Sequence, residues 1–196
     1  MNVIADAVRS VYAKKGYSFL DDGSPYQLNI FGVRNYGAVN RFNDFLCVCF
    51  RNSINEWVLR QWPGTTMPGL SMLQGPVNPR GTAILVPGQY VDTWKRDLHA
   101  GKYEALCQRL KPVRVFRDAN RDTKYDLDPA TIQEGMFGIN IHKAGTLTES
   151  VDRYSAGCQV FQREVDFNLF MAIVDAAIKK GATAFSYTLF EKTDFE

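Results

Sequence analysis

The stretch that decides the fold runs from Asp44 to Trp62 and reads DFLCVCFRNSINEWVLRQW. Apolar residues dominate Asp44–Arg51, turn-forming residues occupy Asn52–Asn55, and aromatic and branched residues return in Glu56–Trp62. Two apolar runs around a short polar turn predict a β-hairpin. We therefore expect the core to be built on strands.

Two of the four cysteines lie inside this hairpin. Cys47 and Cys49 are two positions apart, so both point to one face of a strand. We expect them to be small buried side chains in a protein that folds in a reducing compartment. With Cys107 and Cys158 they form no CxxC spacing, so the cysteines predict neither a disulfide framework nor a metal centre.

The rest of the chain adds strands and two helices. Apolar residues at helical spacing predict a packing helix over 2–15 and a second helix over about 165–180. Alternating or short apolar runs predict further strands over 26–34, 82–87, 113–117, 135–142 and 184–190.

Two stretches fit neither helix nor strand. Residues 63–81 carry several prolines and glycines and predict a long irregular loop. Residues 88–106 are rich in polar and aromatic side chains and suggest a segment with a short helical piece. Because the six or seven predicted strands are joined by turns and loops, we expect an α+β, mainly β fold. Its core is predicted to be antiparallel or mixed, sandwich- or barrel-like, in a single domain over 1–196.

Composition narrows the classes of partner. There are 23 basic and 21 acidic residues, a net charge of +2. This near balance does not indicate a protein that binds nucleic acid. No apolar run approaches the roughly 20 residues that span a bilayer. The first residues show no basic segment followed by an apolar one, so we expect synthesis in the cytoplasm without a signal peptide. The oligomeric state does not follow from these features.

The chain has only two histidines, and one of them lies close in sequence to Cys158. His142 ends the predicted strand Gly138–His142, on the same face as Asn140. Cys158 follows small residues, and Gly157 can adopt a tight backbone conformation that turns successive N–H groups toward an oxyanion. A thiol beside an imidazole is a nucleophile with its base. The alternative is a buried cysteine and a hydrogen-bonded histidine with structural roles.

This window resembles the active-site signature of L,D-transpeptidase catalytic domains, cysteine enzymes with a β fold that act on bacterial peptidoglycan. In that family an apolar strand ends in histidine, and a loop then leads to Ser/Thr-His-Gly-Cys. Here the matching segments are Gly138–His142 and Ser155–Cys158 in the last third of the chain.

The resemblance implies a role for each matching residue. Cys158 would attack a carbonyl and His142 would act as the base. The backbone of Gly157 and Cys158 would bind the oxyanion, and Ser155 would support the loop. The substrates would be peptidoglycan peptides, cleaved or transferred through a thioacyl intermediate by a phage lysis enzyme or one carried in a phage particle. Such an enzyme would reach the cell wall after release or within the particle.

The sequence departs from the family pattern at two positions. Ala156 stands where the family has a second histidine, and Val160 stands where it has Arg or Asn. His99 is a candidate to replace the missing histidine, and Arg153 and Asn140 are candidates to bind substrate. The departures also support a non-catalytic reading, a virion structural or cell-wall-binding protein that keeps the fold. Hydrolysis and transfer both remain open.

The proposed cysteine chemistry requires no cofactor. One further motif concerns a candidate calcium site. Oxygen-bearing side chains follow one another at the start of a calcium-loop-like pattern: Asp118, Asn120, Asp122 and Asp126. Thr123 and Pro129 stand where such a loop has glycine and glutamate. The alternative is a solvated hairpin tip, and a calcium site here is the weaker candidate.

Overall fold

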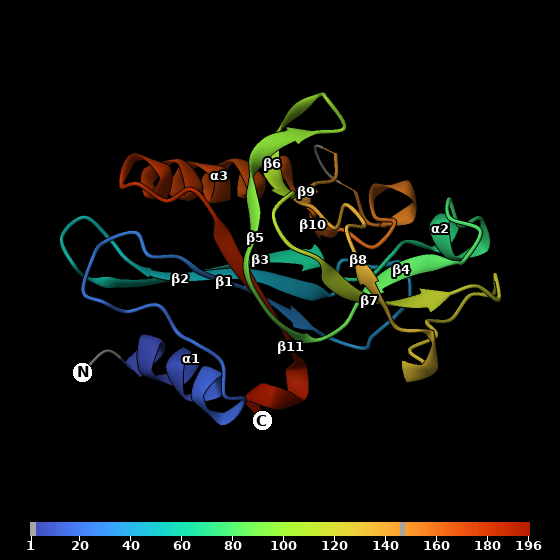
Figure 1. Cartoon of the computed structure of the whole chain (residues 1–196), viewed down its shortest axis with the longest axis horizontal. Coiled ribbons are helices and arrows are strands. Elements are labelled where there is room, and N and C mark those ends of the chain that lie inside the picture. Colours follow the sequence, from blue (N-terminus) through green and yellow to red (C-terminus); the bar gives the residue numbers. More distant parts are fainter. Residues whose placement is uncertain (1–2, 146–147) are drawn as a thin grey trace.

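The computed structural model describes residues 3–145 and 148–196, and its centre is a closed barrel of strands (Figure 1). The barrel strands follow the order β1-β11-β5-β6-β9-β10-β3-β2. Their bounds are β1 Asn29–Arg34, β2 Asp44–Arg51, β3 Trp57–Thr65, β5 Gly88–His99, β6 Tyr103–Gln108, β9 Ile141–Lys143, β10 Gln159–Phe161 and β11 Phe185–Glu191. Closure pairs β1 with β11, at opposite ends of the sequence.

A smaller sheet and three α-helices complete the described chain. The small sheet has the order β4-β7-β8, with bounds β4 Thr82–Leu85, β7 Val113–Asp118 and β8 Gln133–Gly135. The helices are α1 Val3–Lys14, α2 Leu70–Gln74 and α3 Glu164–Lys179. Three 3₁₀ turns are η1 Pro129–Thr131, η2 Asp152–Tyr154 and η3 Lys192–Phe195. The predicted α+β, mainly β fold with a barrel-like core is therefore confirmed.

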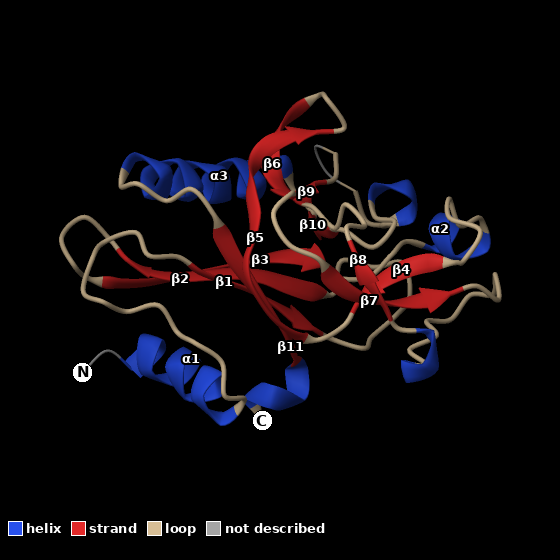
Figure 2. Cartoon of the chain, in the orientation of Figure 1, coloured by secondary structure: helices blue, strands red, loops and turns tan. Residues whose placement is uncertain are grey.

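The hairpin over residues 44–62 forms as predicted. Strands β2 and β3 pair antiparallel, with Arg51 opposite Trp57 next to the turn and Asp44 opposite Gly64 at the far end. Alternate residues of β2 point to opposite sides. Cys47 and Cys49 are buried against α1, whereas Leu46 and its alternate neighbours face the main core and α3. Helices α1 and α3 accordingly lie on opposite sides of these strands (Figure 2). All four cysteines are free, and the predicted burial of Cys47 and Cys49 is confirmed.

The two predicted helices are found as α1 and α3, with Asn2 of the first outside the described residues. Other expectations were wrong in detail. Residues 88–106 contain no helix but most of the hairpin β5–β6, whose turn has positive φ at Ala100 and Gly101. Trp94 anchors this hairpin because it is fully buried in the barrel. The long loop over 63–81 is shorter than predicted, since β3 continues to Thr65 and α2 follows. Eleven strands are found in the described residues, more than predicted.

Pairing is mixed, as expected. Strands β1 and β11 run parallel, as do β9 and β10, while the other neighbouring strands pair antiparallel. No helix of the described residues has the length and apolar character needed to cross a membrane.

Trp94 connects the barrel to the segment that precedes β9. Its indole N–H donates to the carbonyl of Ile139 at 2.6 Å, and both residues are buried. We expect Trp94→Phe to leave that carbonyl without a donor, which costs about 1–3 kcal/mol of unfolding free energy beyond the lost packing. Chemical denaturation measures the change.

Trp62→Phe is the matched control for the lost ring. Trp62 is also buried, but no hydrogen bond of its indole is found within the described residues. Equal losses of stability in the two variants would contradict a role for the Trp94–Ile139 bond.

Candidate functional site

The sequence window that joins histidine to cysteine folds into two neighbouring parallel strands. Ile141 of β9 pairs with Gln159 of β10, and His142 pairs with Val160. The N–H of Gln159 also donates to the carbonyl of Asn140 at 2.9 Å. Cys158 and Asn140 therefore sit just before the two strands, at the same level of the barrel edge.

The predicted strand over 135–142 is interrupted in the structure. Strand β8 ends at Gly135 and β9 begins at Ile141. The backbone turns at Gly138, where φ is +70°. A continuous strand cannot form because its N–H groups are taken by a buried side chain: Gln108 Oε1 accepts from Phe137 at 3.1 Å and from Ile139 at 3.0 Å.

This irregular segment forms one wall around the thiol. Cys158 Sγ lies 3.5 Å from the carbonyl oxygen of Gly138 and 3.5 Å from the backbone nitrogen of Asn140. Cys158 is partly exposed, whereas the other three cysteines are buried. Cys158 is therefore the least buried of the four cysteines, and it lies at the position that the sequence predicts for the nucleophile.

Both histidines lie in the same cluster. His99, at the end of β5, stacks on His142 with ring centroids 4.0 Å apart and planes at 20°. Asn140 Nδ2 donates to His99 Nδ1 at 3.0 Å, and Asn140 Oδ1 accepts from the Gln108 N–H at 3.0 Å. The structure thus brings together Cys158, His142, Asn140 and His99, which lie far apart in sequence.

The tautomer of His142 follows from its neighbours. Its Nδ1 lies 2.8 Å from the carbonyl oxygen of Lys143, which can only accept, so Nδ1 carries the proton. Nε2 then has a free lone pair and can act as a base. The hydroxyl of Tyr103 also lies 3.3 Å from Nδ1 and donates to the same carbonyl at 3.3 Å, which restrains the ring.

The loop before Cys158 is held by Ser155. Its buried hydroxyl donates to the carbonyl of Cys158 at 2.8 Å and accepts from the N–H of Gly157 at 3.2 Å. The Gly157 N–H predicted for the oxyanion hole is therefore already used inside the loop. The Cys158 N–H is left as the candidate oxyanion donor, and Ser155 occupies the supporting position that the resemblance implies.

Arg153 is less closely placed. It lies in η2, two residues before Ser155, and is exposed. Within the described residues its side chain takes part in no hydrogen bond or ion pair. Nothing in its surroundings orients it toward Cys158.

Burial keeps the thiol and both imidazoles neutral. It raises the pKa of Cys158 to about 11, with the N–H of Asn140 acting in the opposite direction. Burial and the neighbouring His99 lower the pKa of His142 to about 3, although the Lys143 carbonyl favours the charged ring. The pKa of His99 is lowered by burial and by Arg109 and Lys102.

The resting site is therefore a neutral thiol near a neutral imidazole, not a thiolate–imidazolium pair. No hydrogen bond between Cys158 and His142 is found in the described part of the chain. An imidazole with a pKa of about 3 is a weak base for a thiol with a pKa of about 11, so general base catalysis requires that substrate binding change the surroundings of both groups.

Three contributors to the site were missed from the sequence: Gln108, Tyr103 and Gln159. Gln159 is fully buried, accepts from the Tyr187 hydroxyl at 2.9 Å and donates to the carbonyl of Gly157 at 3.3 Å. Local pattern gives no signal for a buried glutamine. Tyr103 was detectable in principle, because recognising the hairpin of β5 and β6 places it opposite His99.

The calcium candidates form a compact loop after β7. Asn120 Nδ2 donates to Asp122 Oδ2 at 3.1 Å and to Asp126 Oδ2 at 2.7 Å. Asp118 is fully buried, and burial followed by the nearby Asp126 and Asp122 carboxylates raises its pKa. No group of three or more Asp, Glu, His or Cys side chains in the described residues is arranged to hold a metal ion. Calcium binding here stays a prediction.

A comparison of the chain with protein-family models, with curated proteins and with solved structures finds no match.

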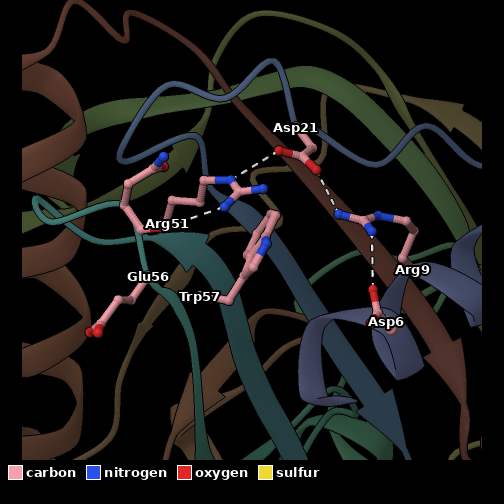
Figure 3. Close-up of a pocket in the computed structure, with 7 residues that line it drawn as sticks. Asp6, Arg9, Asp21, Arg51, Glu56 and Trp57 are labelled. Carbon is pink, nitrogen blue, oxygen red and sulfur yellow. Dashed lines mark hydrogen bonds and ion pairs between the residues drawn. The ribbon is translucent and has the colours of Figure 1, made fainter. Parts of the chain in front are cut away.

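A cavity of about 680 Å³ lies away from this site, against α1 and the β2–β3 turn (Figure 3). Asp21 stands between Arg9, at 2.6 Å, and Arg51, at 3.1 Å, and Arg9 also binds Asp6 at 3.2 Å. Arg51 lies 4.5 Å above the ring of Trp57. These cations are neutralised by carboxylates of the chain itself, so we assign the cavity a structural role.

We expect Gly157→Ala to damage the loop more than Gly138→Ala. A Cβ at Gly157 would lie 2.3 Å from the carbonyl oxygen of Ala83, at φ +119°. A Cβ at Gly138, at φ +70°, meets nothing within 4 Å and carries only the backbone penalty of about 1–2 kcal/mol. The first change should cost about 1–3 kcal/mol more, measured by thermal denaturation. Equal costs would show that the loop does not pack on Ala83 as described.

Alkylation of Cys158 should be slow at neutral pH. A pKa raised to about 11 means less thiolate at a given pH than in an ordinary thiol, so the iodoacetamide rate should rise about tenfold per pH unit between pH 8 and 10. Peptide mapping by mass spectrometry follows Cys158 alone, with free glutathione as the reference thiol. A rate that levels off below pH 8 would contradict the neutral resting site.

Proposed function

We propose that the chain is a cysteine-dependent enzyme that cleaves or transfers peptidoglycan stem peptides through a thioacyl intermediate. The observation that carries the proposal is the cluster at the barrel edge. Cys158, the least buried of the four cysteines, contacts the backbone of Asn140, whose side chain binds the stacked pair made of both histidines of the chain. The substrate class comes from the resemblance of Gly138–His142 and Ser155–Cys158 to the L,D-transpeptidase signature. The proposed place of action is the cell wall, reached after release or within a phage particle.

The chemistry begins when Cys158 Sγ attacks the carbonyl carbon of the substrate. A C–S bond forms as the thiol proton passes to Nε2 of His142, and the oxyanion is met by the N–H of Cys158. The tetrahedral intermediate then collapses. The C–N bond breaks, and the proton on His142 goes to the leaving amine. Water or a second amine attacks the thioester, releases the acyl group and returns the proton to Cys158.

The resting geometry sets one requirement for this sequence of steps. Cys158 Sγ now contacts the carbonyl of Gly138, so the thiol has to turn from that contact toward the imidazole when substrate arrives. Lys143 and Tyr103 hold Nδ1 of His142 in place, which keeps Nε2 as the basic atom. His99 stacks on the same ring and replaces solvent on one face.

A second candidate function is a non-catalytic virion structural or cell-wall-binding protein. It is favoured by the raised pKa of Cys158 and the lowered pKa of His142. At pH 7 both groups are neutral, so they form no thiolate–imidazolium ion pair. This candidate predicts retention of the chain on purified sacculi without release of any peptide or amino group.

Turnover of purified sacculi separates the two candidates. We expect the unmodified chain to release soluble products or exchange stem-peptide termini. Cys158→Ala should lower the rate by about 1000-fold or more because the nucleophile is lost, and His142→Ala by about 100-fold because the base is lost. Chromatography with mass spectrometry quantifies the products.

Cys49→Ala is the matched control, since Cys49 is a buried thiol packed against α1 on the other side of β2. It should keep full activity. Products that persist in Cys158→Ala would show that Cys158 is not the nucleophile, and binding without products in the unmodified chain would favour the non-catalytic candidate.

A further inference from the structure

A cavity of about 460 Å³ adjoins the Cys158 loop. Its lining includes Val77, Pro79, Met136, Phe137, Ala156 and Arg117. Ala156 lies two residues before Cys158, and Phe137 directly precedes Gly138, whose carbonyl contacts the thiol. The cavity therefore borders the site on the side of the small sheet.

Arg117 of β7 is the one charged residue in the lining of this cavity, and it is only 8% exposed. Its guanidinium binds neutral acceptors: Nε donates to Gln133 Oε1 at 3.0 Å, and Nη1 donates to the carbonyl of Gly81 at 3.1 Å. The guanidinium lies 4.6 Å from the centre of the Phe137 ring. The hydrogen bonds described for this side chain leave Nη2 unused.

Among the described residues, no carboxylate compensates the charge of Arg117 with an ion pair. None of the ion pairs found within the described residues includes Arg117, in contrast to Arg9 and Arg51 in the other cavity. Burial, followed by the nearby Arg80, lowers the pKa of Arg117. A buried cation without a counter-ion is costly in free energy, and an anion that enters the cavity would recover much of that cost.

The walls define the rest of the ligand. Val77, Met136 and Phe137 present apolar side chains, and Ala156, two residues before Cys158, adds a methyl group. An occupant that satisfies both features has an anionic group for Arg117 and a small apolar group beside it. A peptide that ends in a free carboxylate has both.

We propose that this cavity is a substrate subsite that binds the free C-terminal carboxylate of a peptide through Arg117, with the terminal side chain against the apolar wall. The proposal rests on the proposed function, because it takes Cys158 as the group that attacks the bound peptide. It deepens that function by naming the substrate class as peptides with an unblocked carboxyl end. Arg117 is then a binding residue for the substrate.

Binding can be measured without turnover in the Cys158→Ala chain. The probes are N-acetyl-alanyl-alanine, with the terminal residue in the L or the D form, and the matching C-terminal carboxamides, titrated by calorimetry or NMR. We expect the better carboxylate probe to bind at least about tenfold more tightly than its carboxamide, as a charge-assisted hydrogen bond warrants. That preference should weaken as salt is raised.

Adding Arg117→Gln should remove the carboxylate preference while binding of the carboxamide is kept, which also reports that the cavity is intact. Arg80→Gln is the matched control, because it removes an exposed charge from the loop that lines the cavity with Pro79 and Gly81, and it should change the preference less than threefold. If Arg117→Gln fails to fold, Arg117→Lys keeps the charge and should retain a reduced preference.

Equal affinity for carboxylate and carboxamide in the parent chain would overturn the proposal, as would a preference that survives in Arg117→Gln. Failure of the proposed function has a different signature. Carboxylate preference that depends on Arg117, combined with no turnover by the unmodified chain, would leave the subsite standing and remove the enzyme.

Discussion

The side chain of Gln108 is the contact on which the geometry of the site depends. This buried amide accepts from the N–H groups of Phe137 and Ile139 and donates to the carbonyls of Lys111 and Gly135. One side chain thus satisfies four backbone groups between Lys111 and Ile139. The irregular path between β8 and β9 can then be buried at small cost, and the carbonyl of Gly138 comes to lie at the thiol.

The same constraint extends to both histidines. The backbone N–H of Gln108 holds Asn140 Oδ1, Asn140 holds His99, and His99 stacks on His142. The result is an ordered, largely buried site whose thiol and imidazoles are neutral. Such a site disfavours adventitious oxidation and alkylation of Cys158, and in the proposed mechanism the thiol is deprotonated only when substrate is bound. Reactivity then depends on a rotation of the thiol.

Patterns of neighbouring residues in the sequence predicted the elements that are stabilised by contacts close in sequence. The alternation in residues 44–62 and the apolar stripes of α1 and α3 were sufficient for those elements. Rare residue types drew attention to Cys158 and His142. Closure of the barrel could not be predicted from local pattern, because the β1–β11 pairing joins residues as distant in sequence as Ile30 and Tyr187. The roles of Gln108 and Arg117 were equally hidden, because both depend on which distant backbone groups and side chains the fold places around them.

The most direct measurement of the central claim is mass spectrometry of the intact chain, quenched in acid during reaction with a synthetic stem peptide. If Cys158 carries the acyl group, a fraction of the protein should gain the mass of the acyl fragment, map that mass to Cys158 and lose it on treatment with hydroxylamine. Product formation with no adduct under conditions that trap thioesters, or an adduct on another residue, would contradict catalysis by Cys158.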